Sequence, residues 1–486
     1  MGKKLFENLG HLDTKQLKRF QSFVDSPYFN KHNKVRRLME YVLPFHPSYD
    51  DKALQQDTIF THLFPEEKFQ QNKLAVIFTY TQRLYRQFVS LERMQSRPME
   101  LELGWLEELR HQMEFDQYEK QYDKIFSQLK KEEKEATLFY HQRYRLSADR
   151  AMLSLQKGRR EEDQSLQSKQ NFLDAFFLAE KFRDACELHL RGKEMKEEFK
   201  LRLIDAAIEE MESQTKIYQP FPFVMMYYNI YIMLTNNDNP DYYYQAFDLL
   251  KSQVHYFSEN ELKTLYNYLQ NYCIEKINSG RADFLKEIFL LYKSQLENEL
   301  LIEEGYLSEW HYKNIVTTGI RLKEIDWVED FIESYKDKMK PDSIDNAYRF
   351  NRAAFCHATQ RYDEVLSLLH QVEYSDLRYN LGAKALLLRT YYELEELDAL
   401  SALTDSFRQY LLRNKLMADT HRRGYYNLFR LTKKMATLRV NQSYYSDKRK
   451  QKEIEQLRRA IDNTTYIFNK SWLEQKYGEL MEEVIV

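Results

Sequence analysis

The residue types that do chemistry are spread thinly along this sequence. A glutamate and a histidine stand at metal-ligand spacing in Glu108-x-x-His111, as a lone pair. A di-iron helical bundle needs two such motifs and two further carboxylates that face inward. We therefore interpret the pair as part of a solvated helix face, and we predict no metal site.

The spacing of the glycines excludes several kinds of catalytic and nucleotide site. The eleven glycines never lie closer than eight residues to one another. Gly-rich phosphate loops and the nucleophile elbow all need glycines within a few residues. We therefore predict neither a cofactor site nor catalytic residues.

The cysteines indicate a reducing compartment. Cys186, Cys273 and Cys356 lie 87 and 83 residues apart, which argues against a disulfide framework or a zinc site. We predict buried free thiols and a cytoplasmic location. The N-terminus has no apolar run typical of a signal peptide, and no apolar stretch approaches the roughly 18 residues of a membrane span.

One candidate for partner binding is a basic region near the C-terminus. Residues 413–459 hold fourteen Lys and Arg against four Asp and Glu. If the surrounding segment is helical, Arg423, Arg430 and Lys434 share one face. Such a stripe could bind nucleic-acid phosphates or an acidic protein. A solvated helix face is the alternative interpretation.

Tyrosine clusters are the second candidate. The chain has 37 Tyr and 30 Phe, and consecutive tyrosines put at least one ring of each cluster off the core stripe of a helix. Tyr227 and Tyr243 are the residues we select, because large, rigid, amphipathic rings suit peptide recognition. Packing between helices is the alternative role for these rings.

Composition indicates an all-α protein. Only 11 Gly and 9 Pro occur in 486 residues, and both residue types are needed for most turns between strands. Charged residues make up 30% of the chain with a net charge of −3, which is typical of a globular protein. The length predicts two or more domains, or an elongated repeat array.

A repeat of helical hairpins organises the segment from Ile315 to Leu412. Trp327, Tyr362 and Leu397 fall 35 residues apart, and each opens a second helix after a polar turn. Apolar residues follow each of them at helical spacing. This period predicts stacked helix pairs, in which no unit can bury its apolar face alone.

The rest of the chain divides around this array. We predict an N-terminal module of four helices, the fourth of them long, in which Asp13-Thr14 caps the first helix and Ser26-Pro27 ends it. Arg97-Pro98 is the predicted junction to the next segment. The predicted segments are 1–96 (module), 97–218 (long hairpins), 219–412 (repeats) and 413–486 (basic helices and a cap).

The repeat segment resembles the tetratricopeptide-repeat (TPR) superfamily. Gly319 and Ala354 stand eight residues before Trp327 and Tyr362, and that family places a small residue against an aromatic in this way. Pro341 stands near the place of the family's closing proline. Arg389 departs from the pattern, because a small residue is expected there.

The whole chain is also similar to uncharacterised bacterial helical proteins, through Ser26-Pro27-Tyr28-Phe29-Asn30 and Asn271-Tyr272-Cys273-Ile274. We expect an all-α, TPR-like α-solenoid with a small N-terminal helical module. The TPR resemblance implies a non-enzymatic protein–protein interaction scaffold, with a protein or peptide on the face formed by the first helices. The alternative is a nucleic-acid-associated protein that uses the basic C-terminal surface.

Overall fold

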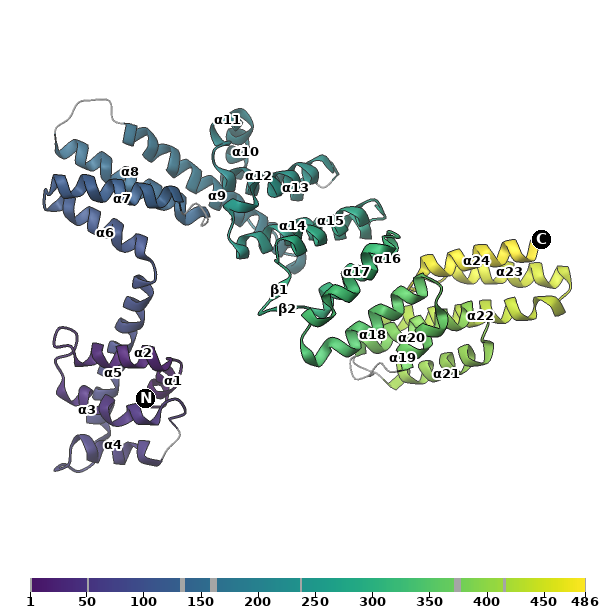
Figure 1. Ribbon diagram of the computed structural model, residues 1–486, viewed down its shortest axis with the longest axis horizontal. Helices are drawn as coiled ribbons and strands as arrows, with labels where there is room; N and C mark the ends of the chain where they lie inside the picture. Colours follow the sequence, from purple (N-terminus) through teal and green to yellow (C-terminus); the bar gives the residue numbers. More distant parts are fainter. Residues whose placement is uncertain are drawn as a thin grey trace. The chain divides into compact units, whose positions relative to one another are not determined.

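The computed structural model describes residues 2–49, 52–131, 136–157, 164–236, 238–370, 377–413 and 417–485. These residues form helices α1 to α24 and, within the same ranges, one pair of two-residue strands (Figure 1). The predicted all-α class and the array of helical hairpins are confirmed. Two compact units are present: Met1–Glu187 with Glu198–Met225, and Leu188–Glu197 with Met226–Val486.

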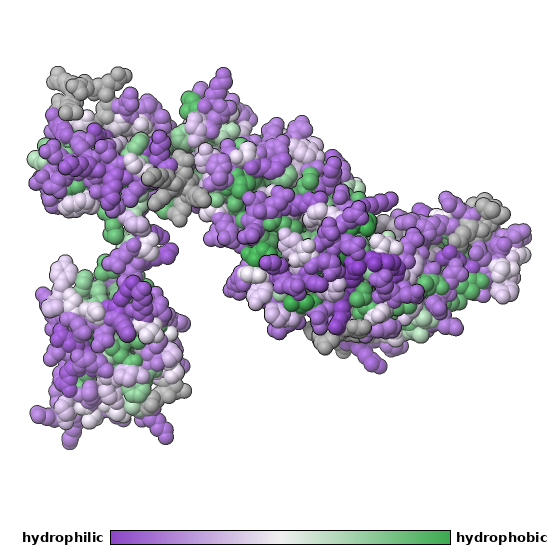
Figure 2. Space-filling model, viewed as in Figure 1, coloured by the Kyte–Doolittle hydropathy of each residue, from purple (hydrophilic) through white to green (hydrophobic). Residues whose placement is uncertain are grey.

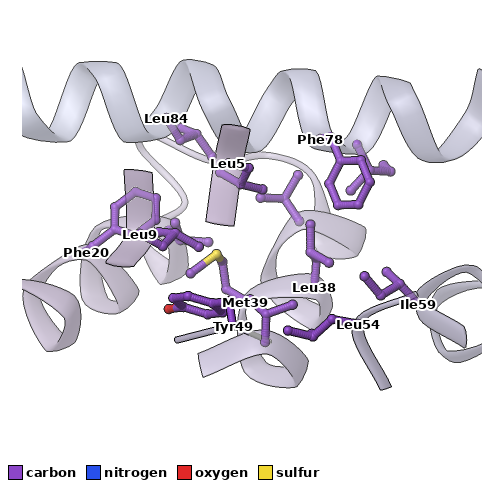
Figure 3. Close-up of a cluster of buried hydrophobic side chains, with 14 of the residues drawn as sticks. Leu5, Leu9, Phe20, Leu38, Met39, Tyr49, Leu54, Ile59, Phe78 and Leu84 are labelled. Carbon is purple, nitrogen blue, oxygen red and sulfur yellow. The ribbon is translucent and has the colours of Figure 1, made fainter. Parts of the chain in front are cut away.

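The N-terminal module contains five α-helices where four were predicted. They are α1 (Gly2–Gly10), α2 (Thr14–Asp25), α3 (Asn33–Val42), α4 (Gln56–Leu63) and α5 (Gln71–Gln95). The additional helix is α1, whose Leu5 and Leu9 are buried. Figure 3 shows both side chains in the same cluster as Phe20 and Met39. All members of this core lie before residue 96, so the module has a core of its own.

Local capping explains where α2 begins and ends. The Asp13 carboxylate accepts hydrogen bonds from the backbone N–H groups of Lys15 and Gln16, each at 2.7 Å. The Gln16 side-chain oxygen accepts a hydrogen bond from the Asp13 N–H at 3.0 Å, which completes a capping box. Ser26 adopts extended geometry before Pro27, as predicted.

The first unit continues with longer helices. Its further elements are α6 (Pro98–His111), α7 (Phe115–Lys131), α8 (Ala136–Gln156), most of α9 (Gln164–Met195), α10 (Ile204–Ser213), α11 (Thr215–Tyr218) and the start of α12 (Pro222–Thr235). A buried polar contact joins α6, α7 and α8. The Asp149 carboxylate pairs with Arg110 Nε at 2.6 Å and accepts a hydrogen bond from the Tyr118 hydroxyl at 2.9 Å.

The second unit contains the hairpin array. The unit consists of the end of α9, most of α12, and α13 (Asp241–Gln253), α14 (Glu259–Asn278), α15 (Phe284–Glu297), α16 (Glu309–Arg321), α17 (Ile325–Tyr335), α18 (Pro341–Ala358), α19 (Tyr362–His370), α20 (Leu377–Glu393), α21 (Leu397–Arg413), α22 (Asp419–Asn441), α23 (Asp447–Asp462) and α24 (Lys470–Ile485). A short antiparallel hairpin, β1 (Ile302–Glu303) with β2 (Tyr306–Leu307), precedes α16. Composition alone did not predict it. Its turn residues Glu304 and Gly305 both have positive φ, as a tight hairpin turn requires.

The three predicted hairpins are α16–α17, α18–α19 and α20–α21, but the 35-residue register is correct only for the last two. Helix α17 begins at Ile325, whereas α19 and α21 begin at Tyr362 and Leu397. The structural equivalent of Tyr362 is therefore Ile325, and Trp327 lies two residues further on. The prediction aligned the hairpins on the aromatic residue Trp327. The backbone turn at Lys323 aligns Ile325 with Tyr362 instead.

The packing of Gly319 and Pro341 also differs from the TPR-like expectation. A Cβ at Gly319 would lie 2.4 Å from Cγ2 of Val328, so the close contact is with Val328. The Trp327 ring instead packs edge-on against Phe289 of α15, with ring centroids 4.9 Å apart. Pro341 is the first residue of α18, where its fixed φ suits a helix start, rather than the end of the preceding unit.

The turn inside each of the three hairpins holds a residue other than glycine in the left-handed region. Lys323, Gln360 and Glu395 have φ values of 61°, 61° and 60°. The N–H of each residue and that of the next one donate to carbonyl groups in the last turn of the preceding helix. This is the Schellman arrangement, which usually places glycine at the left-handed position.

Replacing Lys323, Gln360 and Glu395 by glycine is expected to stabilise the array. Glycine relieves the strain of positive φ but loses more chain entropy on folding, so each change should raise the free energy of unfolding by about 0.5–1 kcal/mol. Urea denaturation of the single and triple variants measures this gain. Glycine at Ala402, an exposed position in the interior of α21, should instead lose about 1 kcal/mol. Destabilisation by the three turn substitutions would contradict the strain argument.

The last hairpin and the C-terminal helices share one hydrophobic core. Its buried members run from Leu381 of α20 to Leu480 of α24, so the predicted boundary at residues 412–413 does not separate two cores. Lys476 of α24 pairs with Glu393 of α20 at 2.9 Å. Trp472 packs edge-on against Tyr392, with ring centroids 5.6 Å apart. Helix α24 thus covers the apolar side of the final repeat.

Candidate functional site

The two tyrosines selected from the sequence are buried, which corrects that prediction. Tyr227 and Tyr243 are 0% exposed. The Tyr227 hydroxyl donates to the Glu261 carboxylate of α14. The Tyr243 ring stacks on Tyr272 of α14, with centroids 5.5 Å apart, and burial raises the pKa of its hydroxyl. Both residues therefore contact neighbouring helices: Tyr227 contacts α14, and Tyr243 contacts α14 and α15.

The three selected basic residues all lie on α22, in different surroundings. Arg423 and Arg430 are exposed, whereas Lys434 is half-buried. Neither Arg423 nor Arg430 has a hydrogen-bond or ion-pair partner within the described part of the chain. Of the three, Arg430 lines a hollow in the protein surface. That hollow is the strongest candidate for a partner-binding site.

We call this hollow the α21–α22 groove. It has a volume of about 130 Å³ and is lined by Thr404, Asp405, Phe407, Arg408, Leu411, Tyr426, Phe429, Arg430 and Lys433. On α21 the lining positions 404, 407, 408 and 411 follow the spacing of one helical face, and positions 426, 429, 430 and 433 do the same on α22. The two helices are neighbours near the C-terminal end of the array in Figure 1.

The floor of the groove is apolar and firmly packed. Phe407 and Phe429 stack with ring centroids 4.1 Å apart, and both side chains are nearly inaccessible to solvent. Leu411 extends the floor along α21, and the Tyr426 ring is 37% exposed. The Thr404 hydroxyl donates to the Leu400 carbonyl at 2.8 Å, which leaves its methyl group available for apolar contact.

The rim of the groove is positively charged. Lys433 pairs with Asp405 at 3.1 Å, so these two charges offset each other. Arg408 and Arg430 are exposed and have no hydrogen-bond or ion-pair partner among the residues that the structure describes. The rim therefore carries two positive charges that no protein group neutralises. Arginine binds carboxylates through two parallel hydrogen bonds and also stacks on planar groups.

Sequence reasoning found one cation of the groove and missed two. Arg408 precedes the basic region that was counted from residue 413, and Lys433 lies off the stripe of Arg423, Arg430 and Lys434. A signal was present in α21, where Phe407 and Leu411 flank Arg408 on one helical face. This pattern indicates a groove only if α22 packs beside α21 with its own apolar and basic residues on the same side. The sequence does not show that these two helices pack together.

A second hollow lies between the first helices of two hairpins, on the kind of surface where the sequence predicted a partner. Glu309, Trp310 and Lys313 of α16 and Tyr379 of α20 line it. Its volume is about 10 Å³. A cavity of roughly 10–15 Å³ holds one water molecule, so this hollow cannot accept a side chain of a partner.

The cysteine thiols of the described residues are not placed as reactive nucleophiles. All three cysteines are free and buried, as predicted. Burial raises the pKa of the Cys273 thiol to about 12 and that of Cys356 to about 11. A nucleophilic cysteine needs the opposite shift. Within the described residues, no three His, Cys, Asp or Glu side chains gather as metal ligands.

The surface outside the groove is largely hydrophilic on the face drawn in Figure 2, where hydrophobic residues form separate small areas. None of the helices in the described ranges has both the length and the apolar character needed to cross a membrane. No protein-family model and no curated protein matches this sequence. The geometry and charge of the groove are therefore the basis for its proposed function.

Proposed function

We propose that this protein is a non-enzymatic protein–protein interaction scaffold of the cytoplasm, which binds a protein or peptide partner in the α21–α22 groove. The observation that carries this proposal is an apolar floor between two helices, bordered by Arg408 and Arg430, which have no ion-pair or hydrogen-bond partner among the described residues. A groove of this kind accepts an amphipathic segment along its length. The buried free thiols support a reducing compartment.

The alternative, binding of nucleic acid to the basic C-terminal surface, has weaker support. At least six of the fourteen Lys and Arg residues between 413 and 459 form ion pairs with nearby carboxylates. Fewer cations are then free to neutralise phosphates, and phosphate contacts supply most of the affinity of non-specific nucleic-acid binding.

The test is affinity capture with charge-reversed variants of the full chain. The double variant Arg408→Glu and Arg430→Glu alters the groove, whereas Arg423→Glu alters an exposed arginine of α22 that does not line it. We expect a stoichiometric protein from the cytosolic extract on the wild-type chain and on Arg423→Glu. The double variant should lose it. Mass spectrometry identifies the bound proteins, and ultraviolet absorbance detects bound nucleic acid.

Two results would overturn the proposal. If the double variant still captured the partner, or if the wild-type protein captured none, the groove would not be the binding site. Nucleic acid that is lost equally from Arg423→Glu and from the double variant at raised salt would favour the alternative function, because a phosphate-binding surface uses every exposed cation.

A further inference from the structure

We infer that the occupant of the α21–α22 groove is an acidic amphipathic segment, with a large apolar side chain flanked by carboxylates. This inference rests on the proposed function and adds the chemistry of the partner. It follows from the size of the hollow, the length of its lining and the charge of its rim.

The size of the hollow suits one large apolar side chain. Its volume of about 130 Å³ is close to that of an engineered apolar cavity of roughly 150 Å³ that binds benzene. The Tyr426 ring, which is 37% exposed, provides the accessible apolar surface beside the nearly buried rings of Phe407 and Phe429. A leucine or phenylalanine of a partner would bury its side chain here, which is how anchor residues of interfaces are bound.

The length of the lining sets the length of the occupant. Each helix contributes residues whose first and last members lie seven positions apart, 404 and 411 on α21 and 426 and 433 on α22. At 1.5 Å per residue, seven positions extend over roughly 10 Å, which is about two helical turns. An occupant of two to three turns therefore covers the groove, with its apolar residues at positions i and i+4.

The rim decides the charge of the occupant. Arg408 and Arg430 have no partners in the described structure, and Asp405 is held by Lys433 at 3.1 Å. A basic segment would place its cations against two unneutralised guanidinium groups, which is unfavourable. Carboxylates on either side of the apolar anchor would instead form charge-assisted hydrogen bonds with them. Desolvation by the apolar anchor strengthens these contacts.

The experiment uses synthetic, fluorescein-labelled peptides and the full chain. The acidic probe is a 14-residue helical peptide with leucines at two positions four residues apart and glutamates beside them, on an alanine and glutamine background. One matched probe has lysine in place of glutamate, and a second has serine in place of leucine. Fluorescence anisotropy measures the affinity of each probe for wild-type protein, Arg423→Glu and the double variant Arg408→Glu and Arg430→Glu.

We expect the acidic probe to bind wild-type protein and Arg423→Glu with affinities that agree within about twofold. The double variant should bind the acidic probe at least about tenfold more weakly, because it replaces two attractive charges at the rim by two repulsive ones. The lysine probe should show the reverse preference and bind the double variant better than the wild type. The serine probe should bind neither protein measurably.

Several outcomes would overturn the inference. Equal affinity of wild-type protein for the glutamate and lysine probes would remove the charge argument, and equal affinity for the leucine and serine probes would remove the apolar anchor. A single-stranded oligonucleotide that displaces the acidic probe and binds more tightly would point to nucleic acid. If the acidic probe fails while the captured partner still depends on Arg408 and Arg430, the scaffold function stands and only the partner chemistry is wrong.

Discussion

Replacing Asp149 by alanine is expected to lower the free energy of unfolding of the α6–α8 region by about 3–5 kcal/mol, the cost of breaking a buried ion pair. The Asp149 side chain is 6% exposed and that of Arg110 is 11% exposed. The substitution leaves the guanidinium of Arg110 and the hydroxyl of Tyr118 without their acceptor. Native-state hydrogen exchange of the amides in α6, α7 and α8 measures the loss.

The control for this prediction is Asp123→Ala. Asp123 is exposed on α7, so its removal should change the stability of the same helices by no more than about 0.5 kcal/mol. Equal effects of the two alanine substitutions would show that the contact with Arg110 and Tyr118 contributes little. Tyr118→Phe should fall between them, since it removes a single hydrogen bond worth about 1.5–3 kcal/mol when the acceptor is charged.

Replacing Glu393 by glutamine is expected to destabilise the C-terminal end of the array by about 3–5 kcal/mol. Glu393 and Lys476 are 12% and 14% exposed, and their contact holds α24 against α20. Burial lowers the pKa of Arg389 to about 10, and the charge of Glu393 opposes that shift. The Glu393 carboxylate thus offsets two cations, and both lose this interaction in the variant.

The measurement is native-state hydrogen exchange of the amides in α20 and α24, the two helices that this pair joins. The double variant Glu393→Gln and Lys476→Met should recover part of the loss, because it removes the ammonium group that Glu393→Gln leaves without its less exposed carboxylate partner. Glu479→Ala serves as the control. Glu479 contacts Lys476 at 2.7 Å but is 45% exposed, so its removal should cost less than about 1 kcal/mol. If Glu479→Ala proved as harmful as Glu393→Gln, burial would not explain the effect.

Periodicity predicted much of this fold because each hairpin repeats the same local pattern. The apolar stripes and polar turns between residues 315 and 412 locate α16 to α21, and the capping residue Asp13 marks the start of α2. The elements that were not predicted include α1 and the β1–β2 hairpin. Helix α1 is nine residues long and has no capping signal in its sequence, and the β1–β2 hairpin depends on the turn residues Glu304 and Gly305. The register error arose because the Trp327 side chain was weighted above the backbone turn at Lys323.

The candidate site was less predictable, because it depends on which helix faces which. Two consecutive tyrosines on a helix point in different directions. The sequence does not say which of these directions faces another helix. Tyr243 is buried, whereas its neighbour Tyr244 is exposed. Arg430 was selected correctly as an exposed cation. Five other lining residues of the groove come from α21. The sequence does not show that α21 and α22 pack side by side.

The left-handed turns bear on the cooperativity of unfolding. Each of Lys323, Gln360 and Glu395 holds a side chain at positive φ, at a cost of about 1–2 kcal/mol to its own hairpin. In a linear array, stability is the sum of the intrinsic stability of each unit and the interfaces between neighbours. Weak units and strong interfaces make neighbouring hairpins unfold together instead of fraying singly. An array with glycine in these turns would be more stable and, for the same reason, less cooperative.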